Sequence, residues 1–305
     1  MFATCSPCFA FSAKDKICVF VADSFVSDAI VRACKEEGAT NVVADTVPIQ
    51  DLQDFFIAEK PDYVILDGSG MASADQQLEF ESKVIAYSAF SRVKRLLLLS
   101  SFTLYPQKHL SLNEALITDQ LFTSHDDPCL IAKAVTAGKC RKGNDPERPT
   151  FILCLYPYLF GPGDPSCKHA STHPLYHIID RIVSAKNENR PFTVIANDGT
   201  AQYDLLYVEE FAKALVHLLK TSRCPEVVNI ATGRDLSVEM LTDQVQGIAG
   251  YTSEVILDPN CYDLVPRHVL DIRRLQELGW TQTISVQDGL RHTISWYTDA
   301  HKRAS

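Results

Sequence analysis

Several residues of the sequence have side chains that transfer protons. Ser100 and Ser101 follow a run of four leucines, and Cys129 and Lys133 are one helical turn apart. A thiol beside an ammonium group ionises more readily than an isolated thiol. His173 is a further candidate, because an imidazole changes its charge near neutral pH. These residue types indicate acid–base chemistry.

A metal site is a second interpretation of the histidines. His169, His173 and His177 are spaced by four residues, which would place three imidazoles on one face of a helix. Pro174 interrupts that helix, and no neighbouring carboxylate or cysteine completes the ligand set. We therefore expect no metal here.

Composition excludes several classes of protein. The chain of 305 residues is 46% hydrophobic and carries a net charge of -9, which does not suit a nucleic-acid-binding face. No apolar run approaches the roughly 20 residues that span a bilayer, so we expect no membrane association. Ten cysteines are scattered along the chain, and Cys5 and Cys8 form a single CxxC without a second pair. This usage predicts a reducing, cytoplasmic location.

The elements that position these residues alternate between strands and helices. This alternation predicts an α/β fold, a Rossmann-type doubly wound parallel sheet with a smaller C-terminal substrate-binding part. We expect a loose tail over 1–13, a dinucleotide-binding domain over 14–160 and the smaller part over 161–305, with some segments returning to the core. Predicted strands are 17–22, 41–44, 63–66, 95–100 and 150–155; predicted helices are 26–37, 51–59, 76–91, 128–139, 208–220, 238–249 and 286–297.

The order of several short motifs resembles the extended short-chain dehydrogenase/reductases, and within them GDP-L-fucose synthases. The resemblance runs from Lys16 to Tyr297. It implies NADP(H) as cofactor and a GDP-sugar as ligand, with epimerisation and reduction of GDP-4-keto-6-deoxymannose as the reaction. The motifs are Ser100-Ser101-Phe102-Thr103-Leu104-Tyr105-Pro106, Ile131-Ala132-Lys133, Phe160-Gly161-Pro162-Gly163-Asp164, Leu206-Tyr207-Val208-Glu209-Glu210, Asn229-Ile230-Ala231-Thr232-Gly233, Leu270-Asp271 and Leu278-Gly279-Trp280.

The cofactor loop departs from the family pattern. The glycines of GxxGxxG, which let backbone amides approach the pyrophosphate, correspond to Val21, Ser24 and Ser27. Asp23 stands where the family carries an arginine, and Asp28 adds a second carboxylate. Negative charges at a helix start stabilise the helix and occupy the place of a phosphate. We therefore expect a self-capped structural helix and weak or lost binding of NADP(H).

The catalytic positions are partly retained. By resemblance, Ser101 would bind the substrate carbonyl, and Lys133 would lower the pKa of a tyrosine and bind the nicotinamide ribose. Cys129 stands where that tyrosine is expected, and Thr103 where a cysteine serves epimerisation. We interpret Cys129 as a small core residue, with a reactive thiol as the alternative. His173 matches the histidine acid of epimerisation.

The expected contacts to the sugar nucleotide are also mixed. Tyr158 replaces an asparagine, and Tyr203 replaces an arginine that would form a charge-assisted fork with a phosphate. Arg181 and Arg267 match basic positions of the family and remain candidates for weak phosphate binding.

Two functions follow from the resemblance. In the first, the protein keeps the fold but has lost the cofactor and proton-donor chemistry, and it acts by binding or by pairing with a partner. In the second, it is an active NADP-dependent epimerase/reductase in which His173, Ser101 and Lys133 share the acid's task. Relatives pair through helices that match 76–91 and 128–139. A homodimer, or a heteromer with a related chain, is therefore expected, with Val84, Ile85, Ala89, Ile131, Ala134 and Val135 as candidate contacts.

Overall fold

The central feature is a six-stranded sheet in a computed structural model that describes residues 9–44, 47–106, 111–118, 127–144, 150–167, 173–258, 260 and 269–304. Its strand order is β10-β6-β4-β3-β1-β2, and every pair is parallel. The strands are β1 (Lys16–Val21), β2 (Asn41–Ala44), β3 (Tyr63–Asp67), β4 (Arg95–Ser101), β6 (Phe151–Tyr156) and β10 (Val227–Asn229).

The leucine run shows why this sheet is buried on both faces. Successive side chains of a strand point to opposite faces. Leu97 and Leu99 join the apolar cluster on one face of β4, while Leu96 and Leu98 join the cluster on the other. All four are fully buried, so helices must cover both faces.

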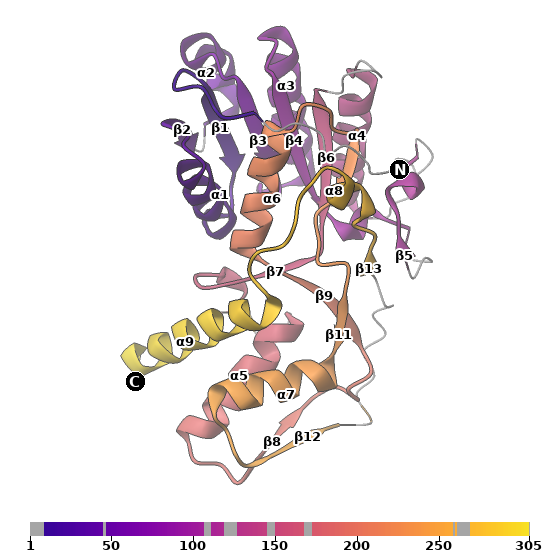
Figure 1. Cartoon of the computed structure of the whole chain (residues 1–305). Helices are drawn as coiled ribbons and strands as arrows, with labels where there is room; N and C mark the ends of the chain where they lie inside the picture. Colours follow the sequence, from indigo (N-terminus) through magenta and orange to yellow (C-terminus); the bar gives the residue numbers. More distant parts are fainter. Residues whose placement is uncertain are drawn as a thin grey trace.

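Helices cover each face of the sheet (Figure 1). The helices α1 (Ser24–Glu36), α6 (Val208–Lys220) and α8 (Arg273–Glu277) contribute to the first cluster. The helices α2 (Leu52–Glu59), α3 (Ala74–Phe90) and α4 (Pro128–Lys142) contribute to the second. Helices α3 and α4 pack directly on each other. Short elements complete this half: η1 (Ile49–Asp51), η2 (Phe102–Leu104), η3 (Glu114–Leu116), β5 (Ser111–Leu112) and β13 (Val269–Leu270).

A smaller part lies below the sheet in Figure 1. It contains a three-stranded sheet of order β11-β9-β7 and a parallel pair, β12-β8, with a separate apolar cluster. Its elements are β7 (Tyr158–Phe160), α5 (Pro174–Asn187), β8 (Phe192–Ile195), β9 (Gln202–Tyr207), β11 (Asp235–Ser237), α7 (Val238–Ala249), β12 (Glu254–Leu257) and α9 (Val286–Ala304). Segments α6, β10 and α8 return to the main sheet.

The predicted α/β class with a parallel sheet is confirmed. In the N-terminal half the predicted bounds differ from the observed ones by at most three residues. Part of the predicted loose tail is attached, since Phe11 packs edge-on against Tyr63 and Phe9 N–H donates to Lys220 O.

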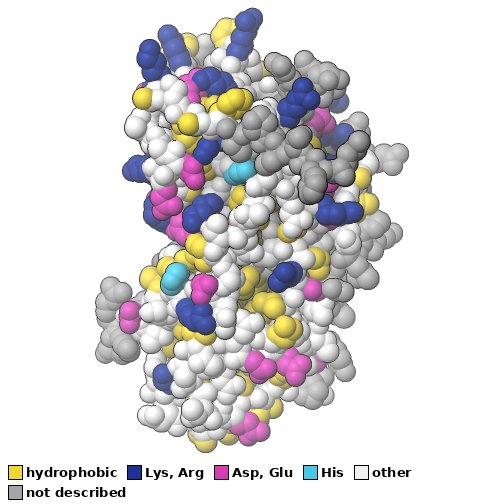
Figure 2. Space-filling model, viewed as in Figure 1, with side chains coloured by type: hydrophobic (Ala, Val, Ile, Leu, Met, Phe, Trp, Pro, Cys, Tyr) yellow, Lys and Arg dark blue, Asp and Glu magenta, His cyan; other side chains and the backbone are white. Residues whose placement is uncertain are grey.

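On the face drawn in Figure 2, basic and acidic side chains are interspersed over the described residues. Among the helices that the structure describes, none has the length and apolar character needed to cross a bilayer.

Candidate functional site

The start of α1 caps itself. Asp23 is extended and stands just before the helix, where its carboxylate accepts a hydrogen bond of 3.0 Å from Phe25 N–H. An aspartate in this position satisfies an amide that would otherwise have no partner, and it stabilises the helix by about 1 kcal/mol. The expected self-capping is thus present. The expected role of Asp28 is wrong, because it lies beyond the first turn of α1.

The positions that correspond to the family glycines hold ordinary structural residues. Val21 ends β1 within the apolar core, Ser24 is exposed at the first turn, and Ser27 is buried. Phe25 packs against the loop that follows β7. A Cβ atom added to Gly161 in that loop would lie 3.1 Å from the ring of Phe25. The loop between β1 and α1 is therefore packed by its own side chains against the segment that follows β7.

Three carboxylates lie at this edge of the sheet, and one of them, Asp67, is paired with Lys133. Partial burial raises the pKa of Asp23, and the nearby charges of Asp164 and Asp67 raise it further against the lowering effect of Phe25 N–H. Burial also raises the pKa of Asp164. A pyrophosphate placed here would meet repulsion from these groups.

Lys133 is the centre of a buried ion network. Its ammonium group donates to Asp67 Oδ1 at 3.0 Å and to Glu81 Oε1. Thr136 donates to the second oxygen of Glu81 at 2.6 Å, and Tyr156 donates to Asp67 Oδ2 at 3.3 Å. Lys133 is 3% exposed and Glu81 is 0% exposed. The network joins β3, α3, α4 and β6.

A glycine permits this arrangement. Gly68 N–H donates to Glu81 Oε1 at 2.9 Å, and a Cβ atom at position 68 would lie 2.8 Å from the Glu81 side chain. Burial alone would lower the pKa of Lys133, but the charges of Asp67 and Glu81 outweigh it and raise that pKa. Burial and Asp67 together hold the pKa of Tyr156 well above its usual value. Lys133 is therefore a permanently charged member of an internal network.

The interpretation of Cys129 as a core residue is wrong. Cys129 lies in the first turn of α4 and is exposed, with its N–H bonded to Asp127 Oδ1 at 2.7 Å. The helix α4 begins at Pro128, but its buried residues start only at Ala132. The first turn, which contains Cys129, is therefore not covered by the core. The alternative of a reactive thiol remains a prediction.

Ser101 and Thr103 lie where the strand order predicts. Ser101 is the last residue of β4, at the carboxyl edge where open α/β sheets bind their ligands. Its hydroxyl caps η2 by accepting a long hydrogen bond of 3.4 Å from Thr103 N–H. Both side chains are half-buried.

His173 stands in a cluster of aromatic rings. The ring of Tyr158 lies edge-on to His173 at 5.7 Å and to Tyr203 at 5.5 Å, and it lies 5.2 Å from Phe102. The ring of Tyr176 also contacts His173, with 4.9 Å between the ring centroids.

Among the described residues, neither ring nitrogen of His173 makes a hydrogen bond of good geometry, although the residue is only 9% exposed and the backbone of Leu159 lies close enough to act on the ring. Burial lowers the pKa of His173 to about 4, against a smaller raising effect of the Leu159 backbone. His173 is therefore neutral near pH 7 and is bonded neither to Ser101 nor to Lys133.

The remaining predicted contacts are dispersed. Arg181 is exposed on α5, and Arg267 lies outside the described residues. His169 also lies outside the described residues. The expectation that the three histidines form no metal site therefore stays a prediction. His173 precedes α5 and is not part of the helix. No cluster of three potential metal ligands occurs in the part of the chain that the structure describes.

Sequence reasoning missed Asp67, Glu81 and Tyr156. Asp67 was visible as an acidic residue that ends the apolar strand β3. Glu81 was visible as a carboxylate on the buried side of α3, between Phe80 and Val84. A charge at such a position needs a partner, and Lys133 was the available cation.

The chain is similar to known proteins over most of its length. Residues 19–231 match the model of the NAD dependent epimerase/dehydratase family. The chain is 30% identical to GDP-L-fucose synthase 1 of Arabidopsis thaliana, over 92% of each chain. It is 26% identical to GDP-L-fucose synthase of Escherichia coli K12, over 93% of this chain and 98% of that one. The solved GDP-L-fucose synthetase of Naegleria fowleri bound to NADP has a TM-score of 0.77 at 15% identity and 97% coverage of each chain.

Proposed function

The chain belongs to the NAD-dependent epimerase/dehydratase family, among the GDP-L-fucose synthase relatives, and we propose that it has kept their fold while losing their hydride-transfer chemistry. It acts by binding, as one subunit of a pair, with a nucleotide sugar as the candidate ligand. A cytoplasmic location is part of the proposal, supported by described cysteines that are all free.

The network around Lys133 carries this proposal. The family lysine must be free to reach a tyrosine and a ribose, whereas the ammonium of Lys133 is bonded to two carboxylates inside the protein. Taking Lys133 out of this network would leave Asp67 and Glu81 buried with uncompensated charge. The self-cap at Asp23 removes a second requirement, the helix start that receives the pyrophosphate.

The test is a measurement of cofactor binding and turnover on the purified full chain. Titration calorimetry with NADPH should give no saturable binding at micromolar concentration, and GDP-4-keto-6-deoxymannose should not be turned over. Asp23→Asn keeps the cap but removes one negative charge, so it should bind NADPH no more weakly than the parent. Turnover of about 1 per second or faster would refute the proposal.

One observation favours the second function. His173 is buried, and among the described residues its ring nitrogens make no hydrogen bond of good geometry, which is costly unless a ligand supplies a partner. An active epimerase/reductase with a relocated acid would use this imidazole with Ser101. Such an enzyme would lose turnover in His173→Gln and would bind NADPH tightly, and the proposed function predicts neither result.

Pairing through α3 and α4 is the second component of the proposal. The two helices pack together, and Lys139 donates to Ser82 at 2.7 Å across them. Of the predicted contact residues, Val84, Ile85 and Ala134 face the core of the protein. Ala89 and Ile131 are exposed and Val135 is half-buried.

Phe90, at the end of α3, is 88% exposed, and Ile131, near the start of α4, is 40% exposed. Exposed apolar side chains on two helices that pack together are compatible with a contact surface. Sedimentation should therefore show a dimer at micromolar concentration that Ile131→Asp disrupts. Ile57→Asp, at an exposed position on α2, is the matched control and should leave the dimer intact. A monomeric parent would remove the homodimer from the proposal.

A further inference from the structure

The strands β8 and β12 form a parallel pair at the end of the molecule opposite α3 and α4 (Figure 1). The inner face of the pair packs on α5, and there Thr193 and Ile195 are buried. On the outer face, Phe192, Val194 and Ile256 are 50%, 37% and 39% exposed. Parallel strands normally occur with both faces covered. The outer face of β8 and β12 is therefore a candidate contact surface.

The register of the pair places apolar and acidic side chains together on this outer face. Val194 is the strand partner of Ile256, and side chains of such partners lie on the same face. Phe192 is the partner of Glu254, which is exposed. Asp258 follows β12, and its N–H continues the pairing with β8. The surface is thus an apolar strip with a carboxylate at each end of its β12 side, and neither strand contains Lys or Arg.

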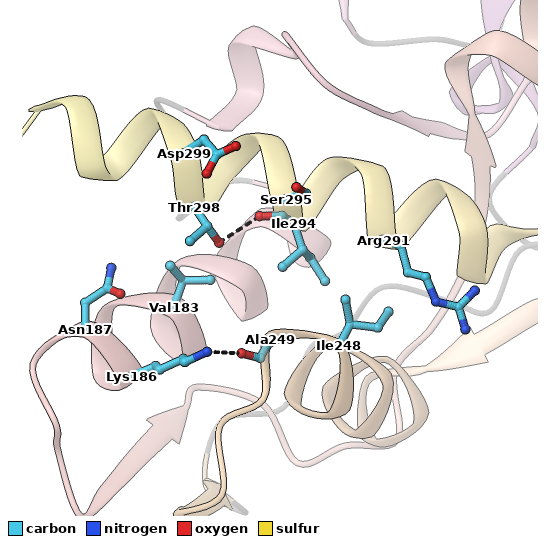
Figure 3. Close-up of a pocket in the computed structure, with 10 residues that line it drawn as sticks. All are labelled: Val183, Lys186, Asn187, Ile248, Ala249, Arg291, Ile294, Ser295, Thr298 and Asp299. Carbon is cyan, nitrogen blue, oxygen red and sulfur yellow. Dashed lines mark hydrogen bonds between the residues drawn. The ribbon is translucent and has the colours of Figure 1, made fainter.

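The helices that lead into the two strands hold the pair in place. Lys186, near the end of α5, donates at 2.6 Å to Ala249 O at the end of α7 (Figure 3). Tyr251 OH donates at 3.1 Å to Arg190 O, which joins the segment before β12 to the segment before β8. The surface is therefore ordered before a partner binds, so less conformational entropy is lost on binding.

We propose that the outer face of β8 and β12 binds a basic amphipathic segment of a partner protein. Apolar side chains of that segment cover Phe192, Val194 and Ile256, and its Lys or Arg side chains face Glu254 and Asp258. The charges favour this partner over a second copy of the chain, whose net charge is -9 and whose matching surface would bring carboxylates against carboxylates. This surface goes beyond the proposed function, because it is separate from the candidate site and from α3 and α4.

The probe is a synthetic amphipathic peptide of leucine and lysine, and methyl NMR of the full chain is the readout. Titration should shift the methyl signals of Val194 and Ile256 with a dissociation constant on the order of 0.1 mM or tighter. The methyl signal of Ile57, which is exposed on α2, should not move. A peptide with glutamate in place of lysine should bind about tenfold more weakly. Equal binding of the two peptides, or no saturable shift up to about 1 mM, would overturn the proposal.

Variants test the apolar and the acidic parts of the surface separately. Ile256→Thr keeps a residue that suits a strand and should weaken binding of the leucine–lysine peptide about fivefold. Glu254→Lys should weaken it by about the same factor. Glu36→Lys is the matched control, because it makes the same change of charge at an exposed position on α1 and should change affinity less than about twofold. Unchanged affinity in both Ile256→Thr and Glu254→Lys, with melting curves that show folded variants, would exclude this surface.

Sedimentation distinguishes a separate partner from a second copy of the chain. Under the proposal, Ile256→Asp should leave the oligomeric state of the parent unchanged. Dimerisation that persists in Ile131→Asp but is lost in Ile256→Asp would assign the outer face to a second copy and overturn the proposal. Neither NADPH binding nor turnover enters these tests, so their failure is distinguishable from failure of the proposed function.

Discussion

The two sides of the candidate site differ in how completely their polar groups are satisfied. On the cofactor side, Lys133 is bonded to Asp67 and Glu81, and Asp23 is bonded to the helix it starts. On the substrate side, His173 is buried among aromatic rings, and within the described residues neither of its nitrogens makes a hydrogen bond of good geometry. A satisfied buried group contributes to folding, whereas an unsatisfied one costs stability and is kept for another reason. This difference supports the proposal that the cofactor side now has a structural role and that the substrate side has kept a capacity for binding.

Breaking the network on the cofactor side should have the largest effect. Glu81→Ala leaves Lys133 without its closest partner, so the free energy of unfolding should fall by about 3 to 5 kcal/mol in urea denaturation. Glu79→Ala is the control on the same helix, because its ion pair with Lys83 is exposed and should contribute less than about 1 kcal/mol. Equal losses in the two variants would show that Lys133 is not held as described.

On the substrate side, burial of His173 should make the free energy of unfolding depend on pH. Because burial lowers the pKa of His173 from 6.5 to about 4, the unfolded chain binds the proton more readily between these values. The stability that neutral His173 permits is present above pH 6.5 and is lost as the pH falls toward 4. Between pH 7 and pH 5 the parent should lose on the order of 2 kcal/mol more than His173→Phe, measured by denaturation at both values. Equal losses of stability in the parent and in His173→Phe would show that His173 is in contact with solvent.

A smaller effect should follow from removal of the cap on α1. Asp23→Ala leaves Phe25 N–H without its acceptor and should lower the free energy of unfolding by about 1 kcal/mol, seen as a lower melting temperature. Asp28→Ala provides the comparison, since Asp28 is exposed beyond the first turn and should change stability by less than about 0.5 kcal/mol. A larger loss in Asp28→Ala would contradict the self-capped helix.

The smallest expected change is in activity. Cys129→Tyr restores the missing phenol, but Lys133 stays bonded to Asp67 and Glu81 and the cofactor loop stays closed. NADPH oxidation in the presence of GDP-4-keto-6-deoxymannose should therefore remain at the level of the parent protein. Turnover gained by this single change would show that the cofactor side is still functional.

Local patterns predicted the sheet well. The leucine run of β4 and the bounds of β2, α6 and α7 followed from periodicity within a few residues. The helix α5 was missed because Pro174 was interpreted as an interruption, whereas proline is favoured in the first turn and here begins the helix.

The candidate site was less predictable, for a physical reason. Its defining contacts join residues that are 66 and 52 positions apart, Asp67 and Glu81 with Lys133. Neither periodicity nor motif spacing reports such pairs. Resemblance identified Lys133 but assigned it a partner that the chain lacks, and the exposure of Cys129 depended on where α4 begins.

The close approach of Gly68 to Glu81 also bears on how this protein can change. Any single substitution that frees Lys133 leaves at least one carboxylate buried without a counter-charge, and any side chain at position 68 displaces Glu81. Variants in which Lys133 alone is freed should therefore fold poorly. Several positions would have to change together to free this lysine without that loss of stability. Under the proposed function, the structural role of Lys133 is therefore difficult to reverse by single mutations.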